Sequence, residues 1–343
     1  MDLQNHFQKI FVEKDPFTDI LGQDGVKSQL KSALLMQRHV LIVGAPGIGK
    51  TTLAKNVAKI LPEVEVVKDC NYNCDPKNPI CPECKQKKSH QKEKIKGEQR
   101  FIRVQGSPDL TAEDLLGDID PIKALKFGPT SVEAFTPGKI FAASRGVLFF
   151  DEINRAPEKL QNALLQVLQE KEATIGSYKV NFPVDFILIA TMNPEDTSTE
   201  KLSDVMLDRF DVIYMGYPEH IDIEKEIVKS KGKKLAVDFP DDLLAMSISF
   251  IRLLRQDKNI DKKPSVRASL GLYERAQSNA YLSKRKKVTF EDIRESIISV
   301  LSHRISLKPS IKYLESPTEY ISQEFGRFVS REAKQIKKEG EGP

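Results

Sequence analysis

The sequence predicts an α/β fold, an αβα sandwich around a mainly parallel sheet, followed by a smaller all-helical domain. Over roughly the first two thirds of the chain, short apolar runs bounded by glycine or proline alternate with apolar residues at helical spacing. From about His220 onward the strand pattern stops and helical periodicity continues alone. Alternating strands and helices are typical of a parallel sheet covered on both faces, so the first part is assigned as α/β.

Apolar runs mark the strands expected in that sheet. Each run is short and rich in Val, Ile, Leu or Phe, as buried parallel strands are. We expect a helix after the first run, ending at Pro62, and another at Glu158–Glu170. A hairpin is expected at Ala173–Pro183, before the last run. The expected strands are Val40–Val43, about Phe101–Gln105, Gly146–Phe150 and Phe186–Thr191.

The remaining chain predicts a helical domain and a tail. Thr289 and Asp292 have the spacing of a capping box for the last helix. We expect an α/β domain over residues 1–218 with a cysteine-containing insertion at about 68–100, a helical domain over 219–330, and a disordered charged tail over 331–343. The expected helices are Ile221–Lys231, Asp241–Leu254, Ser265–Ala280 and Phe290–Ser302.

The 343-residue chain has nearly equal numbers of basic and acidic residues and enough apolar residues to fold. Hydrophobic residues make up 40%, enough for a buried core, which argues against global disorder. The net charge of +4, from 53 basic and 49 acidic residues, does not by itself indicate nucleic-acid binding. No run approaches the roughly 18 apolar residues of a membrane helix, and no secretory signal begins the chain. We therefore expect a cytoplasmic protein that does not insert into a membrane.

A complete phosphate-binding motif follows the first predicted strand. In G-x-x-x-x-G-K-[ST], glycines let the backbone N–H groups converge on phosphate, and the next helix adds its positive dipole end. Lys50 then supplies a charge to the β/γ oxygens, and the Thr51 hydroxyl is placed to ligate Mg²⁺. The motif does not distinguish adenine from guanine. The predicted nucleotide-binding residues here are Gly44, Ala45, Pro46, Gly47, Ile48, Gly49, Lys50, Thr51 and the next residue, Thr52.

Two carboxylates end the third predicted strand. Asp151 is expected to hold the Mg²⁺ hydration shell, and Glu152 to orient and polarise the attacking water as a general base. The alternative is an acidic cap on the following helix, where carboxylates suit the helix dipole. Both interpretations can hold together, because a catalytic carboxylate can also lie at a helix start.

Polar residues at three further places are candidates for completing the site. Asn193, at the mouth of the fourth strand, can hydrogen-bond the γ-phosphate or the water, or form an Asx turn before Pro194. Arg209 can reach a neighbouring subunit's γ-phosphate, or form a surface salt bridge. Arg267 lies in the first turn of a predicted helix, a placement that opposes the helix dipole and suits an anion.

Together these ordered motifs resemble the AAA+ superfamily, in the branch of MoxR-type ATPases and the ATPase subunit of magnesium chelatase. Phe149–Pro157 is similar to the MoxR Walker B segment, and Ile189–Pro194 to the sensor 1 strand. Thr136–Gly146 is similar to the approach to Walker B, and Val288–Arg304 to the closing lid helices. The resemblance spans about residues 15 to 305. Pro194–Asp196 looks chelatase-like and Leu202–Asp211 looks more like MoxR.

The resemblance implies roles that spacing alone does not establish. It makes Asn193 sensor 1, Arg209 an arginine finger acting in trans, and Arg267 the sensor 2 arginine, with Gln23 in an adenine pocket. A helix 2 insert is expected between Leu110 and Lys139, and a pre-sensor 1 hairpin at Ala173–Pro183. It also implies a homo-oligomer, a hexameric ring, which remodels a protein partner that often carries a von Willebrand factor A domain.

All four cysteines lie in one short segment. Their pattern is C-x₃-C-x₆-C-x₂-C, and paired cysteines at such spacings can bind Zn²⁺ tetrahedrally, although the central spacer is shorter than in most zinc fingers. Disulfides or redox switching, and inert thiols, are the alternatives. The candidate zinc ligands are Cys70, Cys74, Cys81 and Cys84, with His90 as a spare.

Competing functions remain at this point. An ATPase that remodels a protein partner is the leading hypothesis, with ATP and Mg²⁺ as cofactors. A nucleic-acid motor is less favoured because the chain has no concentrated basic and aromatic stripe. The ATPase subunit of a metal chelatase is a further alternative. A nucleotide-gated scaffold with little turnover is disfavoured by the intact Asp151–Glu152 pair.

Overall fold

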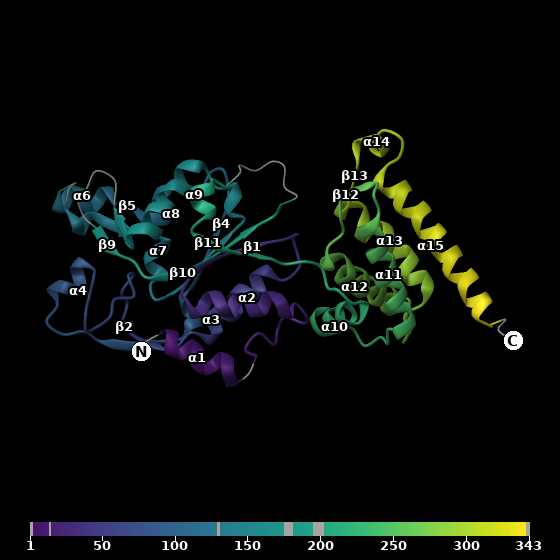
Figure 1. Cartoon of the computed structure of the whole chain (residues 1–343), viewed down its shortest axis with the longest axis horizontal. Helices are drawn as coiled ribbons and strands as arrows, with labels where there is room; N and C mark the ends of the chain where they lie inside the picture. The colour runs from purple at the N-terminus through teal and green to yellow at the C-terminus, as the bar shows by residue number, and fades with distance from the viewer. Residues whose placement is uncertain (1–2, 14, 129–130, 175–180, 195–201, 341–343) are drawn as a thin grey trace. The chain divides into compact units, whose positions relative to one another are not determined.

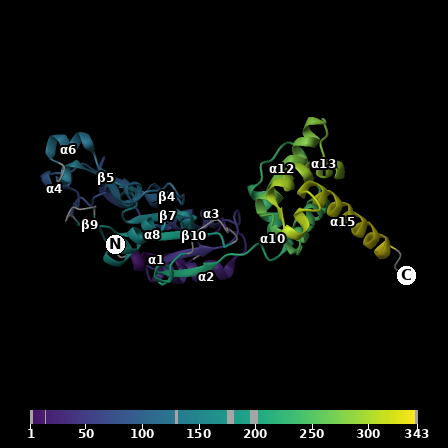
Figure 2. The same ribbon diagram turned by 90° about the horizontal axis from the view of Figure 1, so that it is seen from above.

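A computed structural model describes residues 3–13, 15–128, 131–174, 181–194 and 202–340. The chain divides into two compact units (Figures 1 and 2). One contains residues 1–44 and 49–215, and the other contains residues 45–48 and 216–343. The long α/β part of the sequence thus ends at Met215, close to where the strand pattern was expected to stop.

A five-stranded parallel sheet forms the centre of the first unit. The strands run in the order β11-β1-β10-β7-β4, and every neighbouring pair is parallel. The four predicted strands are all present, which confirms the α/β assignment. An edge strand, β11, was not predicted, and its Val212 and Tyr214 side chains are exposed. The strands are β1 (His39–Val43), β4 (Phe101–Gln105), β7 (Gly146–Asp151), β10 (Phe186–Met192) and β11 (Phe210–Tyr214).

Helices cover both faces of this sheet (Figure 1). Strand side chains alternate between the faces, so Leu41 of β1 and Leu148 of β7 share one core cluster with Leu164 of α8. Helices α2 and α3 contact the opposite side of β1 and β7. Each fully buried Leu or Phe contributes about 1.5–3 kcal/mol to the free energy of unfolding. The covering helices are α1 (Leu3–Glu13), α2 (Asp24–Leu35), α3 (Lys50–Ile60), α7 (Lys139–Ala142), α8 (Glu158–Glu170) and α9 (Asp204–Leu207).

Accessory hairpins extend one end of the first unit, where both views place α4, β5, α6 and β9 together (Figures 1 and 2). The predicted hairpin is present as β8 paired with β9, and residues 175–180 between them lie outside the described residues. The predicted helix 2 insert contains α5, α6 and a second hairpin, β5–β6. The accessory elements are β2 (Val64–Val67), α4 (Pro82–Gln86), β3 (Lys92–Ile95), α5 (Ala112–Leu116), β5 (Gly117–Ile119), α6 (Pro121–Phe127), β6 (Phe135–Pro137), β8 (Glu172–Thr174) and β9 (Asn181–Pro183).

The second unit is predominantly helical, as predicted. All four predicted helices are present, and Thr289 and Asp292 form the predicted capping box. Two short strands, β12 and β13, pair antiparallel beside them. The elements are α10 (Ile221–Lys231), α11 (Asp241–Gln256), β12 (Ile260–Lys262), α12 (Val266–Leu282), α13 (Phe290–Leu301), β13 (Ser306–Leu307), α14 (Pro309–Lys312) and α15 (Pro317–Gly340).

The C-terminal segment differs from the expected disordered tail. Helix α15 continues through residues 331–340, and residues 341–343 lie outside the described part of the chain. Ile321, Phe325 and Phe328 bury one face of its first half in the core of the second unit. The rest is rich in Glu, Lys, Arg and Gln, which have good helix propensity, so the anchored helix can propagate along the charged segment.

Candidate nucleotide site

Strand ends that are far apart in sequence meet at the carboxyl edge of the sheet. Val43 lies beside Met192, and Ala190 beside Phe150, so β1, β10 and β7 end at nearly the same level. The Gly44 N–H donates to the Met192 carbonyl oxygen at 3.1 Å. The phosphate-binding loop, Asn193 and the Asp151–Glu152 pair therefore leave the sheet together, at the edge where parallel α/β sheets bind ligands.

Backbone geometry explains the glycines of the loop. Gly47 has φ +78° and Gly49 has φ +109°, conformations that disfavour residues with a Cβ. Lys50 begins α3 and is buried, and its Nζ donates to the Gly44 carbonyl oxygen. Thr51 follows in the first turn of α3. The positive dipole end of a helix therefore faces this loop, an arrangement that suits an anion.

Thr191 connects the two carboxylate residues. Its hydroxyl donates to Asp151 Oδ1 at 2.6 Å, and the Glu152 N–H donates to the Thr191 Oγ1 at 2.9 Å. Thr191 is fully buried in β10, whereas Asp151 ends β7. Glu152 has φ +54°, a left-handed conformation that non-glycine residues rarely adopt. The bridge holds a strained residue at the site, which is a common feature of functional residues.

Side chains from β4 and from a short turn after β7 are the polar partners of the two carboxylates. Arg103 pairs with Asp151 Oδ2 at 2.6 Å, and the Gln105 amide donates to Glu152 Oε2 at 3.0 Å. Arg155, in the 3₁₀ turn η3 (Ile153–Arg155), lies 3.1 Å from the same Glu152 oxygen. The two carboxylates therefore have different polar neighbours, with one basic group close to each.

Gly106 lets the chain pass close to this pair. Its N–H donates to the Asp151 carbonyl oxygen at 2.7 Å, and a Cβ built on it would lie 2.0 Å from the Glu152 carbonyl oxygen. Real Cβ atoms do not approach an oxygen that closely, so the residue that passes the Glu152 carbonyl oxygen here has to be glycine.

Sequence reasoning missed several of these residues. Thr191 gives no local signal, because one threonine inside an apolar run is ordinary in a strand. Arg103 and Gln105 alternate at the end of a predicted strand, a pattern that could have indicated side chains on one face. Their partners depend on the β4–β7 register, in which Gln105 lies beside Asp151.

Of the predicted arginines, Arg209 does not join this edge, whereas Arg267 lies against the phosphate-binding loop: a Cβ built on Gly47 would lie 3.0 Å from Arg267 Cδ. Arg209 directly precedes β11, at the amino end of the strand, so roughly 16 Å of strand separates it from the carboxyl edge. It forms an ion pair with the neighbouring Asp208 at 3.4 Å. Arg267 belongs to the second unit, where it is exposed near the start of α12 and its N–H donates to Ser265 Oγ. Gln23 precedes α2 with φ +61°.

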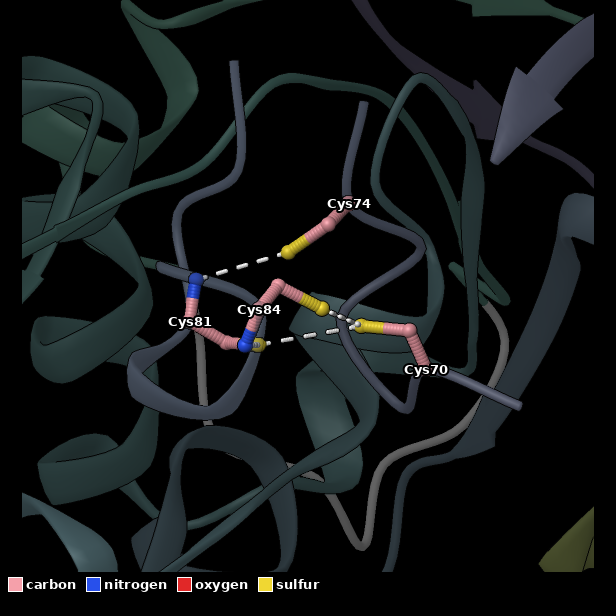
Figure 3. Close-up of side chains that lie close together, drawn as sticks. All are labelled: Cys70, Cys74, Cys81 and Cys84. Carbon is pink, nitrogen blue, oxygen red and sulfur yellow. Dashed lines mark hydrogen bonds between the residues drawn. The ribbon is translucent and has the colours of Figure 1, made fainter. Parts of the chain in front are cut away.

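The four cysteines form a second cluster in the first unit, in the loop between β2 and β3 (Figure 3). Their sulfur atoms all lie within 4.8 Å of one another, and none is in a disulfide. Three are buried and Cys70 is partly buried. The structure therefore brings together the whole set of predicted zinc ligands, apart from the spare candidate His90.

Family comparisons agree with this architecture. Residues 16–91 match the family described as magnesium chelatase, subunit ChlI, and residues 86–212 match the ATPase family associated with various cellular activities. Residues 255–323 match the AAA lid domain. The AAA+ core and the lid are thus both recognised along the chain.

Solved structures of similar fold include an assembly of the BchI and BchD subunits of magnesium chelatase. The similarity has a TM-score of 0.50 at 21% identity, covering 87% of this chain and 98% of that one. A RuvB mutant of Thermotoga maritima gives 0.50 at 18% identity, covering 85% and 74%. At these identities the likeness shows the fold alone.

Relatives identified by sequence share a higher identity with this chain than these solved structures do. The magnesium-chelatase subunit ChlI homolog of Methanocaldococcus jannaschii is 30% identical over 331 residues, covering 86% of each chain. The chloroplastic ChlI-2 subunit of Arabidopsis thaliana is 28% identical, covering 86% of this chain and 76% of the relative. The chain belongs to the family of magnesium-chelatase subunit ChlI and its homologues, within the AAA+ ATPases.

Proposed function

We propose that the chain binds ATP with Mg²⁺ at the carboxyl edge of the sheet and hydrolyses it. The observation that carries this proposal is the meeting of the phosphate-binding loop with the Asp151–Glu152 pair, which Thr191 holds together. Membership of an ATPase family supports the same reaction.

Each group has a distinct role in this proposal. Backbone N–H groups of the Gly44–Gly49 loop beyond Gly44 itself bind the β-phosphate, and Lys50 neutralises the β/γ oxygens. Thr51 ligates Mg²⁺ and Asp151 holds its hydration shell, while Glu152 polarises the attacking water. Asn193 orients that water or the γ-phosphate. The remaining proposed contacts are made by Ala45, Pro46, Ile48 and Thr52 along the phosphates and by Gln23 at the adenine.

We further propose that a neighbouring copy of the chain completes the site, as in a hexameric ring. Arg209 lies at the opposite end of β11 from the loop, so the arginine suits a neighbour's γ-phosphate better than its own. Arg267 is the proposed sensor 2 residue. Burial, together with the nearby charge of Arg267, lowers the pKa of Arg304, so an anion beside these two arginines would relieve their repulsion.

Hydrolysis in this proposal changes the conformation of a protein partner, such as one with a von Willebrand factor A domain. A second candidate function is the ATPase subunit of a metal chelatase complex. The magnesium-chelatase names of the relatives favour that candidate. ATP hydrolysis reconstituted with a partner purified from the same cells separates the two: stimulation by the partner alone supports remodelling, whereas insertion of a metal ion into an added chelating substrate supports the chelatase. Nothing in the fold similarity to RuvB favours a nucleic-acid motor.

We also propose that the protein works in the cytoplasm, as its sequence led us to expect. Among the helices that the structure describes, none is long and apolar enough to cross a bilayer. Fractionation of cells into cytosol and membrane, with detection of the chain in each, tests this placement.

The proposed reaction is tested by nucleotide binding and phosphate release. Lys50→Ala removes the phosphate-binding charge, and we expect both ATP binding and hydrolysis to fall below detection. Lys55→Ala is the matched control, because Lys55 lies in the same helix with its side chain exposed. Normal phosphate release by Lys50→Ala would contradict the proposed site.

A further inference from the structure

We propose that Cys70, Cys74, Cys81 and Cys84 bind one Zn²⁺ ion through four thiolates. The ion would close the loop between β2 and β3, and it would be separate from the Mg²⁺ of the nucleotide site. This inference goes beyond the proposed ATPase and does not depend on it.

Sulfur spacing matches a tetrahedral metal site. Cys70 Sγ lies 3.8 Å from Cys81 Sγ and 3.6 Å from Cys84 Sγ. Four sulfurs at a Zn–S distance of about 2.3 Å form a tetrahedron with edges of about 3.8 Å. A disulfide requires about 2.05 Å instead. Cys70 Sγ thus lies from two other sulfurs at the separation that a shared ion produces, nearly twice the length of a covalent S–S bond, and all four sulfurs lie within 4.8 Å of one another.

Peptide N–H groups point at the sulfurs. Ile80 and Cys81 donate to Cys74 Sγ at 3.3 and 3.4 Å, and Cys84 donates to Cys81 Sγ at 3.4 Å. Such hydrogen bonds stabilise the negative charge of metal-bound thiolates and orient the ligands. The loop thus directs N–H donors at two of the four sulfurs, those of Cys74 and Cys81, and metal-bound thiolates accept such hydrogen bonds.

Donor set and charge favour zinc over other common ions. No His, Asp or Glu in the described part of the chain joins the cluster, so the ligands are four sulfurs. Mg²⁺ and Ca²⁺ prefer oxygen, whereas closed four-sulfur tetrahedral sites are typical of structural zinc. Zn²⁺ with four thiolates carries a net charge of about −2. Lys68, Lys77, Lys85, Lys87 and Lys88 in the same segment can balance that charge.

The loop that carries the cysteines packs against α7, the residues between α7 and β7, and β9. The Asn73 amide donates to the Ala142 carbonyl oxygen at 2.8 Å, and Arg145 donates to the Asn73 carbonyl oxygen at 2.7 Å. The Tyr72 ring lies 5.1 Å from Phe141 of α7 and 5.6 Å from Phe182 of β9. The ion would therefore hold the loop in the shape that packs against α7 and the β8–β9 hairpin.

Metal analysis of the full chain, expressed in cells and purified under reducing conditions, tests the proposal. We expect about one zinc per chain. Cobalt exchanged into the site should give the intense visible bands of tetrahedral cobalt bound to four thiolates. Cys74→Ser should lose most of the zinc, because a buried ligand is replaced. His90→Ala is the control and should retain it, because His90 lies in the same segment but outside the cluster.

Other outcomes overturn the proposal. A metal-free protein with four reactive thiols would show that the cluster is four inert cysteines. Two disulfides in the native protein would show that the cysteines are oxidised in pairs and bind no metal. Iron in place of zinc would refute the assigned ion. If Cys74→Ser does not fold, the cobalt spectrum of the wild-type chain still decides, because it requires no variant.

Discussion

The carboxyl edge of the sheet and the cysteine loop are built in opposite ways. The edge combines residues from three strands far apart in sequence, Gly44–Thr51, Asp151–Glu152 and Asn193, which the strand register brings together. The cysteine cluster draws all its ligands from residues 70–84 of one loop. A site made by a sheet is as stable as the core, whereas a site made by a loop depends on what closes the loop.

Because they are built differently, the carboxyl edge and the cysteine loop need different things to be stable and complete. β7 and β10 are almost entirely buried, so the edge has a rigid support. The cysteine loop contains one short helix, α4, and gains its order from the sulfur cluster and from contacts made by residues such as Asn73. In our account, the edge is stable without zinc but incomplete without a second subunit, and the loop is complete within one chain but unstable without its ion.

Among the variants that still bind ATP, the largest effect should come from Arg209→Ala, which tests whether the edge is incomplete. Loss of an arginine finger should lower kcat by about 10³-fold or more with little change in ATP binding. Mixing Arg209→Ala subunits with Lys50→Ala subunits should restore part of the turnover, because each supplies what the other lacks.

Arg38→Ala is the control for that experiment, since Arg38 is an exposed arginine whose ion-pair partner, Asp211, lies in β11 two residues after Arg209. Mixed rings with no recovery of phosphate release would contradict action in trans.

The next largest effect is expected from Glu152→Gln. Losing the base that polarises water should reduce kcat by about 10²–10⁴-fold while Mg²⁺ and ATP still bind. Equilibrium binding of a labelled nucleotide, measured beside phosphate release, separates the two steps. Glu158→Gln, an exposed glutamate at the start of α8, should behave as wild type. Equal activity of Glu152→Gln and wild type would remove Glu152 from the mechanism.

Thr191→Val should have an intermediate effect. Valine preserves the shape but removes the hydroxyl that bridges Asp151 and Glu152. Loss of a hydrogen bond to a charged group costs about 1.5–3 kcal/mol. If the transition state for hydrolysis is destabilised by that amount, kcat should fall by about tenfold or more. Thr191→Ser keeps the hydroxyl and should recover most of the rate. Indistinguishable kinetics for the Val and Ser variants would show that the bridge has no catalytic role.

A small effect is expected from Arg103→Ala. The Arg103 side chain is half exposed, and exposed ion pairs contribute about 0–1 kcal/mol. Its removal frees an Asp151 oxygen, so the Mg²⁺ concentration needed for half-maximal hydrolysis should fall by about two- to threefold at most. A large rise in that concentration would instead make Arg103 a direct part of the nucleotide site.

Local signals explain what the sequence could predict. The glycines of the loop, the apolar runs and the Asp151–Glu152 pair are each readable within a few residues, and all of them meet at the predicted edge. Strand β11 was missed because Val212 and Tyr214 face solvent and break the buried pattern. The Thr191 bridge was missed because it depends on the pairing of β7 with β10, which no local pattern encodes. For the cysteines, spacing left zinc, disulfides and free thiols open, and only the sulfur positions favour an ion.

The most direct test measures zinc content and phosphate release together in wild type, Lys50→Ala and Cys74→Ser. We predict that Lys50→Ala keeps about one zinc per chain and loses hydrolysis. Cys74→Ser should lose zinc yet bind ATP within about threefold of wild type at a temperature where it stays folded, since the edge is held by the sheet core. Hydrolysis by Lys50→Ala at the wild-type rate would contradict the central claim that the carboxyl edge is the ATPase site.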